Sequence, residues 1–360
     1  MPPYIERLVI ELTNRCNMKC LFCPHHVLKT RRKDMDFELF KKIIKDISDY
    51  NSANSENRLT DIIIFTGMGE QLLYSKFNDA VKYVVSNGLK AHLTTNGLIL
   101  NDEKYSGMVT SGIDYVNISF HNLTKDSFKY RGTKVSYQKY YNNLLSLIDL
   151  HLHKQFSNHL EISVMYSLPD SKEAFLWDQL PSMHFSSYQY ILLLLDFLRD
   201  IFNLLDKRNI IPETGIGDLL GVYENGTIKN STVFNLTKNL SLHFTPLQHQ
   251  VFNTREKLKG EAGKKIELVK KHNAHCYYLR GCPMIFSNGD FIPCGSESTG
   301  ELTMGTVSFE TSFISILNSE KYRQFVKLIT APIDDLNKLP FPCRECMVLN
   351  ELKWKSSPLC

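Results

Sequence analysis

Two kinds of apolar pattern alternate over the first two-thirds of the chain. Short runs of β-branched and other apolar residues predict six strands, at 8–12, 62–66, 91–95, 115–120, 160–166 and 240–244. Apolar residues at helical spacing predict helices between them, including 37–47, 77–85 and 137–148. This alternation is typical of βαβ units and a parallel sheet. Six units cannot close an eight-unit barrel, so we expect an α/β partial barrel or an open sheet, with its chemistry at the carboxyl ends of the strands.

The segment before the sixth strand, about 170–239, is longer than one crossover helix requires. It contains a leucine-rich helical run at 191–205, which charged residues interrupt and which is shorter than a membrane span. A hairpin is predicted at 221–229, with Asn225-Gly226 as its turn. We interpret 170–239 as an insertion that either shapes a substrate pocket or decorates the periphery of the fold.

Composition and charge are those of a soluble globular protein. The chain has 43% hydrophobic and 22% charged residues, which is ordinary for this class. A net charge of +4 is too small to predict nucleic-acid binding. The first residues lack the basic-then-apolar layout of a signal peptide. A cytoplasmic protein is therefore expected, with neither a membrane nor a nucleic acid among its partners.

The nine cysteines fall into two groups. Three lie within 16–23 and the other six follow residue 275, after a basic stretch at about 254–272 that is predicted to be helical. An odd number, this clustering and the missing secretory signal favour metal binding over a disulfide framework. We therefore predict a barrel domain over 1–250 and a small cysteine-rich domain over 251–360.

Cys16, Cys20 and Cys23 directly follow the first predicted strand. Three thiolates can hold three irons of a [4Fe–4S] cube and leave the fourth iron open to a small molecule, whereas a fully ligated cluster only transfers electrons. The alternative is a zinc site completed by His25 or His26. Structural zinc is usually held by paired CxxC or histidine knuckles, which this spacing does not provide.

The spacing Cys16-x3-Cys20-x2-Cys23 after a first strand resembles the radical SAM superfamily. The aromatic Phe22 before the last cysteine matches that family, in which this residue packs near the adenine of S-adenosylmethionine (SAM). The segment Gly67-Met68-Gly69-Glu70, at the end of the second strand, resembles the Gly-Gly-Glu element whose backbone receives the SAM ammonium group. Met68 between the glycines, and Gln71 in place of proline, depart from the family pattern.

Three further residues match family positions. Asn96 lies in the Thr-Thr-Asn-Gly segment that ends the third strand, and Ser119 ends the fourth. Arg131, in an Arg-Gly pair, corresponds to a recurring arginine of the family. The resemblance implies that Ser119 contacts the carboxylate or ribose of SAM and that Arg131 reaches the same carboxylate, although both could be polar groups at the sheet edge. His121 is interpreted as structural.

The second cysteine group resembles the SPASM/twitch domains that carry auxiliary [4Fe–4S] clusters. Six thiolates are too few for two fully ligated clusters, so one auxiliary cluster is predicted. Family spacing assigns its ligands to Cys276, Cys294, Cys343 and Cys346, with Cys282 and Cys360 as alternates. A two-residue hairpin turn at 288–289 would pair Pro283 with Cys294 and bring Cys282 beside Cys294. The same cysteines could also build a zinc site.

The resemblance implies a partial (β/α)6 TIM-like barrel with a SPASM/twitch-like domain. It also implies that a flavodoxin- or ferredoxin-type reductant drives cleavage of SAM to a 5′-deoxyadenosyl radical, which abstracts hydrogen from a substrate C–H bond. Sulfatase-maturing relatives place an aspartate as base where this chain has Gly295. Many peptide-modifying relatives begin with a peptide-binding domain, whereas here the first strand starts near residue 7.

We therefore expect oxidation or epimerisation of a small molecule such as a carbohydrate or cyclitol. The alternatives are a peptide-modifying radical SAM maturase and, from another class, a non-catalytic zinc-binding adaptor. Cys282, if it is not a ligand, is a candidate hydrogen-atom donor for epimerisation.

Overall fold

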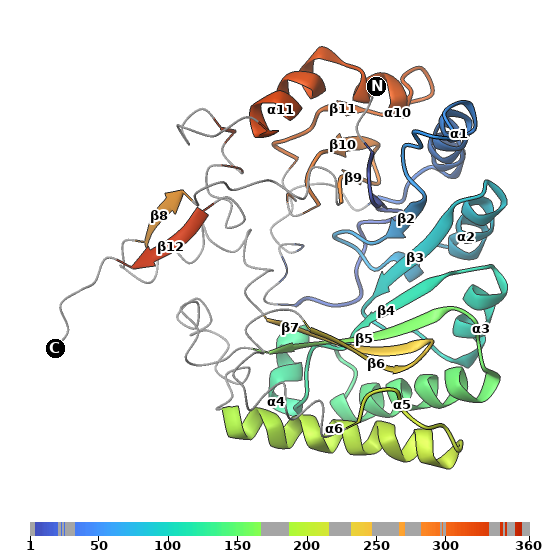
Figure 1. The fold of residues 1–360 in the computed structure, drawn as a ribbon, viewed down its shortest axis with the longest axis vertical. Coiled ribbons are helices and arrows are strands. Elements are labelled where there is room, and N and C mark those ends of the chain that lie inside the picture. Colours follow the sequence, from blue (N-terminus) through green and yellow to red (C-terminus); the bar gives the residue numbers. More distant parts are fainter. Residues whose placement is uncertain are drawn as a thin grey trace.

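One curved sheet of ten strands organises the chain in a computed structural model (Figure 1). The strand order is β11-β10-β9-β1-β2-β3-β4-β5-β7-β6. The structure describes residues 4–20, 23, 25, 33–166, 187–215, 232–246, 266–270, 282–295, 297, 300–330, 339–340, 343 and 350–354.

The centre of the sheet is a run of six parallel strands. They are β1 (Leu8–Ile10), β2 (Ile62–Phe65), β3 (Lys90–Thr95), β4 (Tyr115–Ser119), β5 (His159–Tyr166) and β7 (Leu240–Pro246). All six coincide with predicted strands, and the order does not close β7 onto β1. The expected α/β partial barrel is confirmed.

Helices cover the outer face of this sheet (Figure 1). They are α1 (Phe37–Ala53), α2 (Phe77–Ser86), α3 (Asp102–Thr110), α4 (Lys125–Phe128), α5 (Tyr137–Lys154) and α6 (Ser187–Lys207), with short 3₁₀ turns η2 (Gln71–Leu73) and η3 (Lys129–Arg131). Side-chain caps start the longer ones: Asp36 accepts from two backbone N–H groups of α1, and Ser136 accepts from one of α5. The leucine-rich run forms α6 as predicted and packs beside α5. No helix of the described segments is long and apolar enough to cross a membrane.

Alternate strand residues point to opposite faces of the sheet. On β4, Val116 and Ile118 are buried in the core that the helices cover, as are Ile162 on β5 and Leu242 on β7. The intervening residues face the concave side, and many of them are polar. The sheet thus separates an apolar outer core from a polar interior.

Short strands from the C-terminal third extend the sheet beyond β1. β9 (Met284–Ile285) pairs parallel with β1, and β10 (Asp290–Ile292) and β11 (Gly305–Thr306) follow in antiparallel order. α10 (Phe313–Leu317) and α11 (Glu320–Thr330) lie beside them. At the other edge, β6 (Thr232–Thr237) pairs antiparallel with β7. The predicted boundary near residue 250 falls outside the described residues and stays a prediction.

The β9–β10 hairpin differs from its prediction by one residue. Phe286 and Asp290 are hydrogen-bonded neighbours, so three residues form the turn rather than two. Gly289 takes φ +91°, which suits glycine at the last position of a three-residue turn. Its carbonyl accepts from Val307 N at 2.8 Å, so packing beside β11 selects the longer turn. The pairing of Pro283 with Cys294 was therefore wrong, although Cys282 still lies opposite this strand end.

The helix predicted at 254–272 was wrong where the structure describes it. Residues Ile266–Lys270 form strand β8, which pairs antiparallel with β12 (Asn350–Trp354). The pairing joins segments far apart in the sequence, so local periodicity could not reveal it. The remainder of that stretch and the hairpin predicted at 221–229 lie outside the described residues.

Candidate functional site

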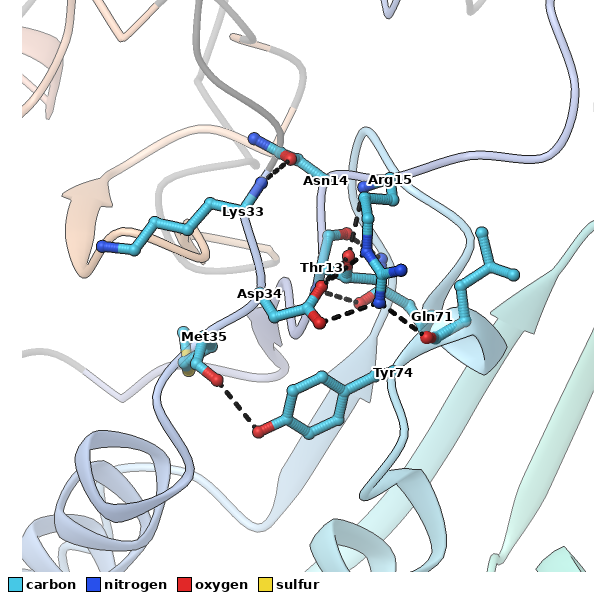
Figure 2. A network of polar contacts seen from close by, with 9 residues as sticks. Thr13, Asn14, Arg15, Lys33, Asp34, Met35, Gln71 and Tyr74 are labelled. Carbon is cyan, nitrogen blue, oxygen red and sulfur yellow. Dashed lines mark hydrogen bonds and ion pairs between the residues drawn. The ribbon is translucent and has the colours of Figure 1, made fainter.

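The first cysteine group lies on a loop that polar contacts hold firmly where it leaves β1 (Figure 2). The Thr13 hydroxyl donates to Asp34 Oδ1 at 2.6 Å, and Arg15 forms a two-pronged ion pair with the same carboxylate at 2.8 and 2.7 Å. Arg15 also donates to the Leu73 carbonyl at 2.9 Å. The loop is thus tied both to the segment before α1 and to η2 after β2.

Gln71 fixes the start of the same loop from inside the protein (Figure 2). Its Oε1 accepts from Leu12 N at 2.7 Å and from Thr13 N at 3.3 Å, while its Nε2 donates to the Thr13 and Gly69 carbonyls, each at 3.2 Å. The side chain is fully buried. The residue that departs from the family pattern therefore has a structural task that sequence reasoning missed.

Changing Gln71 to leucine is expected to lower the free energy of unfolding by about 2 kcal/mol, because buried backbone groups lose their partners. We also expect faster iron loss from the reconstituted protein. Urea unfolding and timed iron release measure the two effects. The matched control is Gln138→Leu, since Gln138 is exposed and its side chain donates to the exposed Asn142 Oδ1 at 2.8 Å. Equal behaviour of the two variants would contradict the role given to Gln71.

Two glycines let neighbouring turns contact the backbone of the cysteine loop. A Cβ atom on Gly69 would lie 2.1 Å from the Thr13 carbonyl oxygen and 2.7 Å from that of Arg15. A Cβ atom on Gly132 would lie 2.5 Å from the Lys19 carbonyl oxygen. The Glu70 N–H donates to the Arg15 carbonyl at 2.7 Å. Both the glycine-rich segment after β2 and the Arg-Gly pair thus contact the loop.

The three thiols of this loop are half-buried and unpaired by disulfides. Burial raises the pKa of each, to about 11 for Cys23, so the thiolate form needs a nearby positive charge. Among the described residues, no group of three His, Cys, Asp or Glu side chains is arranged to hold one metal ion. A four-iron cube fits such a loop because it binds each thiolate through a different iron. His25 is buried and its Nε2 is 2.8 Å from the Asn14 carbonyl, while Phe22 and His26 lie outside the described residues.

A buried donor on the same loop supports this fit. Asn17 Nδ2 has no hydrogen-bond partner although it is shielded from solvent, while its Oδ1 accepts from Asn96 Nδ2 at 2.7 Å. Asn96 Nδ2 also lies 4.0 Å from Cys16 Sγ. An unsatisfied buried donor is costly unless a ligand accepts its hydrogen bond. Asn17 is a site residue that sequence reasoning did not single out.

Glu70 supports Asn96. Its carboxylate accepts from Asn96 N and from the Thr95 hydroxyl, each at 2.7 Å, and from Leu72 N at 3.2 Å. Burial raises the Glu70 pKa, against the effect of these donors. The Asn96 carbonyl also accepts from the Tyr140 hydroxyl at 2.6 Å. Asn96 is therefore held rigidly beside Cys16.

Arg131 joins the cysteine loop to the concave side of the sheet. It is 2% exposed, its Nε lies 3.3 Å from Met18 Sδ, and its carbonyl accepts from Lys19 N. Its Nη1 lies 2.9 Å from His121 Nδ1. Burial, and then the Arg131 charge, hold the His121 pKa well below its usual range, so His121 is neutral and accepts this hydrogen bond.

A cavity of about 400 Å³ lies on the concave side of the sheet. His121 lines its end near the cysteine loop. Most of the other lining groups are polar side chains, among them Thr94, Asn117, Ser119, Glu161, Ser163 and His243. The cavity therefore begins next to Arg131 and runs along the inner face of the parallel strands. Of the predicted SAM-binding residues, Ser119 faces this cavity.

Glu11 connects the glycine-rich segment to the C-terminal hairpin. Its Oε2 accepts from Met68 N at 2.7 Å, and its Oε1 accepts from the Ser287 hydroxyl at 3.0 Å and from Ser287 N at 3.3 Å. The side chain is 2% exposed. One buried carboxylate thus links two regions that were predicted to serve different clusters.

Three of the six C-terminal cysteines lie among the described residues. Cys343 is buried, while Cys294 and Cys282 are half-buried. A Cβ atom on Gly295 would lie 2.7 Å from the Cys282 carbonyl oxygen, so Cys282 lies beside the end of β10. Because β9 is parallel to β1, Cys282 lies at the amino end of β1, opposite the end that leads to the first cysteine loop. Cys276, Cys346 and Cys360 lie outside the described residues.

Two known families match the chain. The radical SAM superfamily matches residues 10–175, and the iron–sulfur cluster-binding SPASM domain matches residues 276–347. The first match contains the Cys16–Cys23 loop and every predicted SAM-binding residue. The second contains five of the six C-terminal cysteines and leaves out Cys360.

Individual proteins are similar over shorter stretches. A tungsten-containing aldehyde ferredoxin oxidoreductase cofactor-modifying protein of Pyrococcus furiosus is 32% identical over 119 residues, which cover 33% of this chain and 32% of that protein. Fe-coproporphyrin III synthase of Methanosarcina barkeri is 27% identical over 133 residues, covering 35% and 30%. The matches span about a third of the length of these curated relatives.

Among solved structures, the fold is similar to that of Streptococcus suis SuiB. The SAM-bound form has a TM-score of 0.53 at 15% identity and covers 95% of this chain and 72% of that chain. The form bound to the precursor peptide SuiA has a TM-score of 0.51 at 15% identity, covering 90% and 67%. At this level of identity the likeness concerns the fold.

Proposed function

The chain belongs to the radical SAM superfamily and carries a C-terminal SPASM domain, and we propose that it is an enzyme that acts on a C–H bond of a small polar molecule. A reduced [4Fe–4S] cluster with bound SAM would supply a 5′-deoxyadenosyl radical, which abstracts hydrogen. The role of the protein is to hold both cofactors and the substrate in register and to exclude water. A flavodoxin- or ferredoxin-type protein is the proposed reductant.

Cys16, Cys20 and Cys23 are the proposed ligands of the first cluster. The contacts of Asp34 and Gln71 support this assignment, because they hold the start of the loop that carries the three cysteines. The proposed SAM contacts are Phe22, Gly67, Met68, Gly69, Glu70, Asn96, Ser119 and Arg131. Within this set, Glu70 acts by fixing Asn96, which lies 4.0 Å from Cys16 Sγ.

We propose one auxiliary [4Fe–4S] cluster in the SPASM domain. Its proposed ligands are Cys276, Cys294, Cys343 and Cys346, with Cys282 and Cys360 as alternates. Cys282 lies beside the strand end that carries Cys294, which supports it as the first alternate. Its place at the amino end of β1 makes hydrogen donation by Cys282 the weaker of its two proposed roles.

The polar cavity is the observation that supports a small substrate. A volume of about 400 Å³ accommodates a molecule of the size of a monosaccharide or cyclitol. Hydroxyl, amide, carboxylate and imidazole groups line it, and such groups match the hydroxyls of a carbohydrate. Oxidation or epimerisation of a carbohydrate or cyclitol is the proposed reaction.

A peptide-modifying maturase is the second candidate, because the fold of SuiB accommodates a precursor peptide. The amount of 5′-deoxyadenosine released in the presence of small polyols or of peptides distinguishes the small-molecule enzyme from the maturase. Stimulation by small polyols and not by peptides is the expected result, and the reverse would favour the maturase.

Anaerobically purified protein is expected to contain about eight iron and eight sulfide ions. A variant with Cys16, Cys20 and Cys23 changed to alanine is expected to retain about four of each. The test is the iron, sulfide and zinc content of the wild-type protein and of the triple cysteine variant. A matched control is wild-type protein carried through the same purification and reconstitution. Zinc without sulfide in both proteins would refute the radical mechanism and support a zinc-binding adaptor.

A further inference from the structure

One histidine in the cavity is paired with a carboxylate. His243 on β7 places its Nδ1 3.1 Å from Glu161 Oε1 on β5. Glu161 is 6% exposed and also accepts hydrogen bonds from Asn117, at 2.5 Å, and from Tyr115. Burial alone would raise its pKa, but these donors outweigh burial and lower it, so Glu161 is a carboxylate. The cavity therefore contains a preorganised carboxylate–imidazole pair.

The pair fixes the protonation pattern of the imidazole. A neutral histidine that donates its Nδ1 proton to a carboxylate has Nε2 as its basic nitrogen. The same hydrogen bond fixes the orientation of the imidazole ring. His243 is 26% exposed at its side chain and lines the cavity, so a ligand can reach it.

The strand register places His243 near the SAM end of the cavity. Ser119 is paired with Ser163, and Ser163 with His243, so the three residues form one row on neighbouring parallel strands. Ser119 ends β4 and is a proposed SAM contact. A substrate carbon held near this row is therefore within reach of both the proposed SAM site and His243.

Other charged and titratable groups that line the cavity are poorer proton acceptors. His92, next to Tyr115 at the far end, is kept neutral by burial, which lowers its pKa to about 4. His121 accepts a hydrogen bond from Arg131 and is next to that charge. Burial, and then Glu161, raise the pKa of Tyr115 far above its usual range. Arg7 is a cation and cannot accept a proton.

We propose that His243, held by Glu161, accepts the hydroxyl proton of a secondary alcohol that is oxidised to a ketone in this cavity. The proposal rests on the proposed function and selects oxidation over epimerisation. The carbon-bound hydrogen atom leaves to the 5′-deoxyadenosyl radical, the hydroxyl proton goes to His243 Nε2, and the remaining electron goes to an oxidised iron–sulfur cluster of the SPASM domain. The C=O double bond forms as the C–H and O–H bonds break, so atoms and electrons balance. This assigns a base in a chain that has Gly295 where sulfatase-maturing relatives place an aspartate.

The test uses the anaerobic holoenzyme with scyllo-inositol, myo-inositol and D-glucose as probes. Wild-type enzyme is expected to form one carbonyl, trapped as a hydrazone, for each 5′-deoxyadenosine released. His243→Gln is expected to keep releasing 5′-deoxyadenosine but to form about 10²-fold less carbonyl per release. Glu161→Gln is expected to lower the ratio of carbonyl formed to 5′-deoxyadenosine released as well, but by a smaller factor. The control His159→Gln, on β5 and bonded to Ser241, is expected to keep the wild-type ratio.

Calorimetric binding of scyllo-inositol gives a second readout that needs no turnover. His243→Phe is expected to bind scyllo-inositol about tenfold more weakly than wild type, because the hydrogen bond from a hydroxyl to Nε2 is lost, while His159→Gln is expected to keep the wild-type affinity. A wild-type carbonyl ratio in both His243→Gln and Glu161→Gln, or a wild-type affinity in His243→Phe, would overturn the proposal. An epimer in place of the carbonyl would overturn it as well. If no probe stimulates wild-type 5′-deoxyadenosine release, the polyol function itself fails, and the inference fails with it.

Discussion

Replacing Gly69 with alanine is expected to lower 5′-deoxyadenosine formation about 10²-fold, because the catalytic groups are displaced from one another. The added methyl group would lie 2.1 Å from the Thr13 carbonyl oxygen and 2.7 Å from that of Arg15. Both are backbone atoms, so no side-chain rotation relieves the contact. Either the cysteine loop or the glycine-rich segment must move, and the proposed SAM site is built from both.

The measurement combines SAM affinity, iron content and 5′-deoxyadenosine formation. Gly107→Ala is the matched control, since a methyl group there meets only the flexible Asn78 side chain at 3.2 Å. Alanine also suits a helix better than glycine, and Gly107 lies within α3. Wild-type SAM affinity and turnover in Gly69→Ala would show that contact between the two segments does not position the cofactors.

Replacing Glu11 with alanine is expected to lower the free energy of unfolding by about 3 kcal/mol. The Met68 N–H, the Ser287 N–H and the Ser287 hydroxyl would all lose a charged acceptor in a buried place. The lost hydrogen bonds belong both to the glycine-rich segment after β2 and to the C-terminal hairpin. We therefore expect weaker SAM binding together with iron loss from the SPASM domain.

Urea unfolding under anaerobic conditions measures the free energy of unfolding. Iron analysis is then repeated with Glu11→Ala introduced into the triple cysteine variant, so that any iron lost there comes from the SPASM domain. Glu320→Ala is the control, because its pairing with Arg323 is at the surface and such pairs contribute about 0–1 kcal/mol. A stability change in Glu11→Ala as small as that of the control would refute the linking role of Glu11.

Local patterns predicted the barrel well because its strands and helices each carry their own signal. The six parallel strands are short apolar runs, and α1, α2 and α5 have apolar residues at helical spacing. The predicted helix at 254–272 was wrong at β8, whose strand partner β12 comes about 80 residues later. The three-residue hairpin turn was missed because packing beside β11 selects it.

The candidate site was predictable where chemistry follows spacing. Three cysteines at fixed intervals after a strand predict a cluster loop, and the radical SAM match spans this loop, while the assignment of the individual ligands stays a prediction. The supporting residues were not predictable in this way. Gln71 acts on Leu12 and Thr13 across 59 and 58 positions, and Glu11 acts on Ser287 across 276. Their types are unremarkable, and their function arises from contacts that exist only in the fold. The pairing of His243 with Glu161 is likewise a contact that exists only in the fold and that the sequence does not predict.

The parallel pairing of β1 with β9 has a consequence for biosynthesis. One edge of β1 is completed only by residues that follow it by 274 positions in the sequence, since the Val9 and Glu11 N–H groups donate to the Pro283 and Ile285 carbonyls. At about 5–20 residues per second, the nascent chain would carry this strand edge unpaired for roughly 14–55 s. An unpaired edge is a template for pairing with other chains. Slow passage through this stage therefore exposes each molecule to aggregation before the β9–β10 hairpin covers β1.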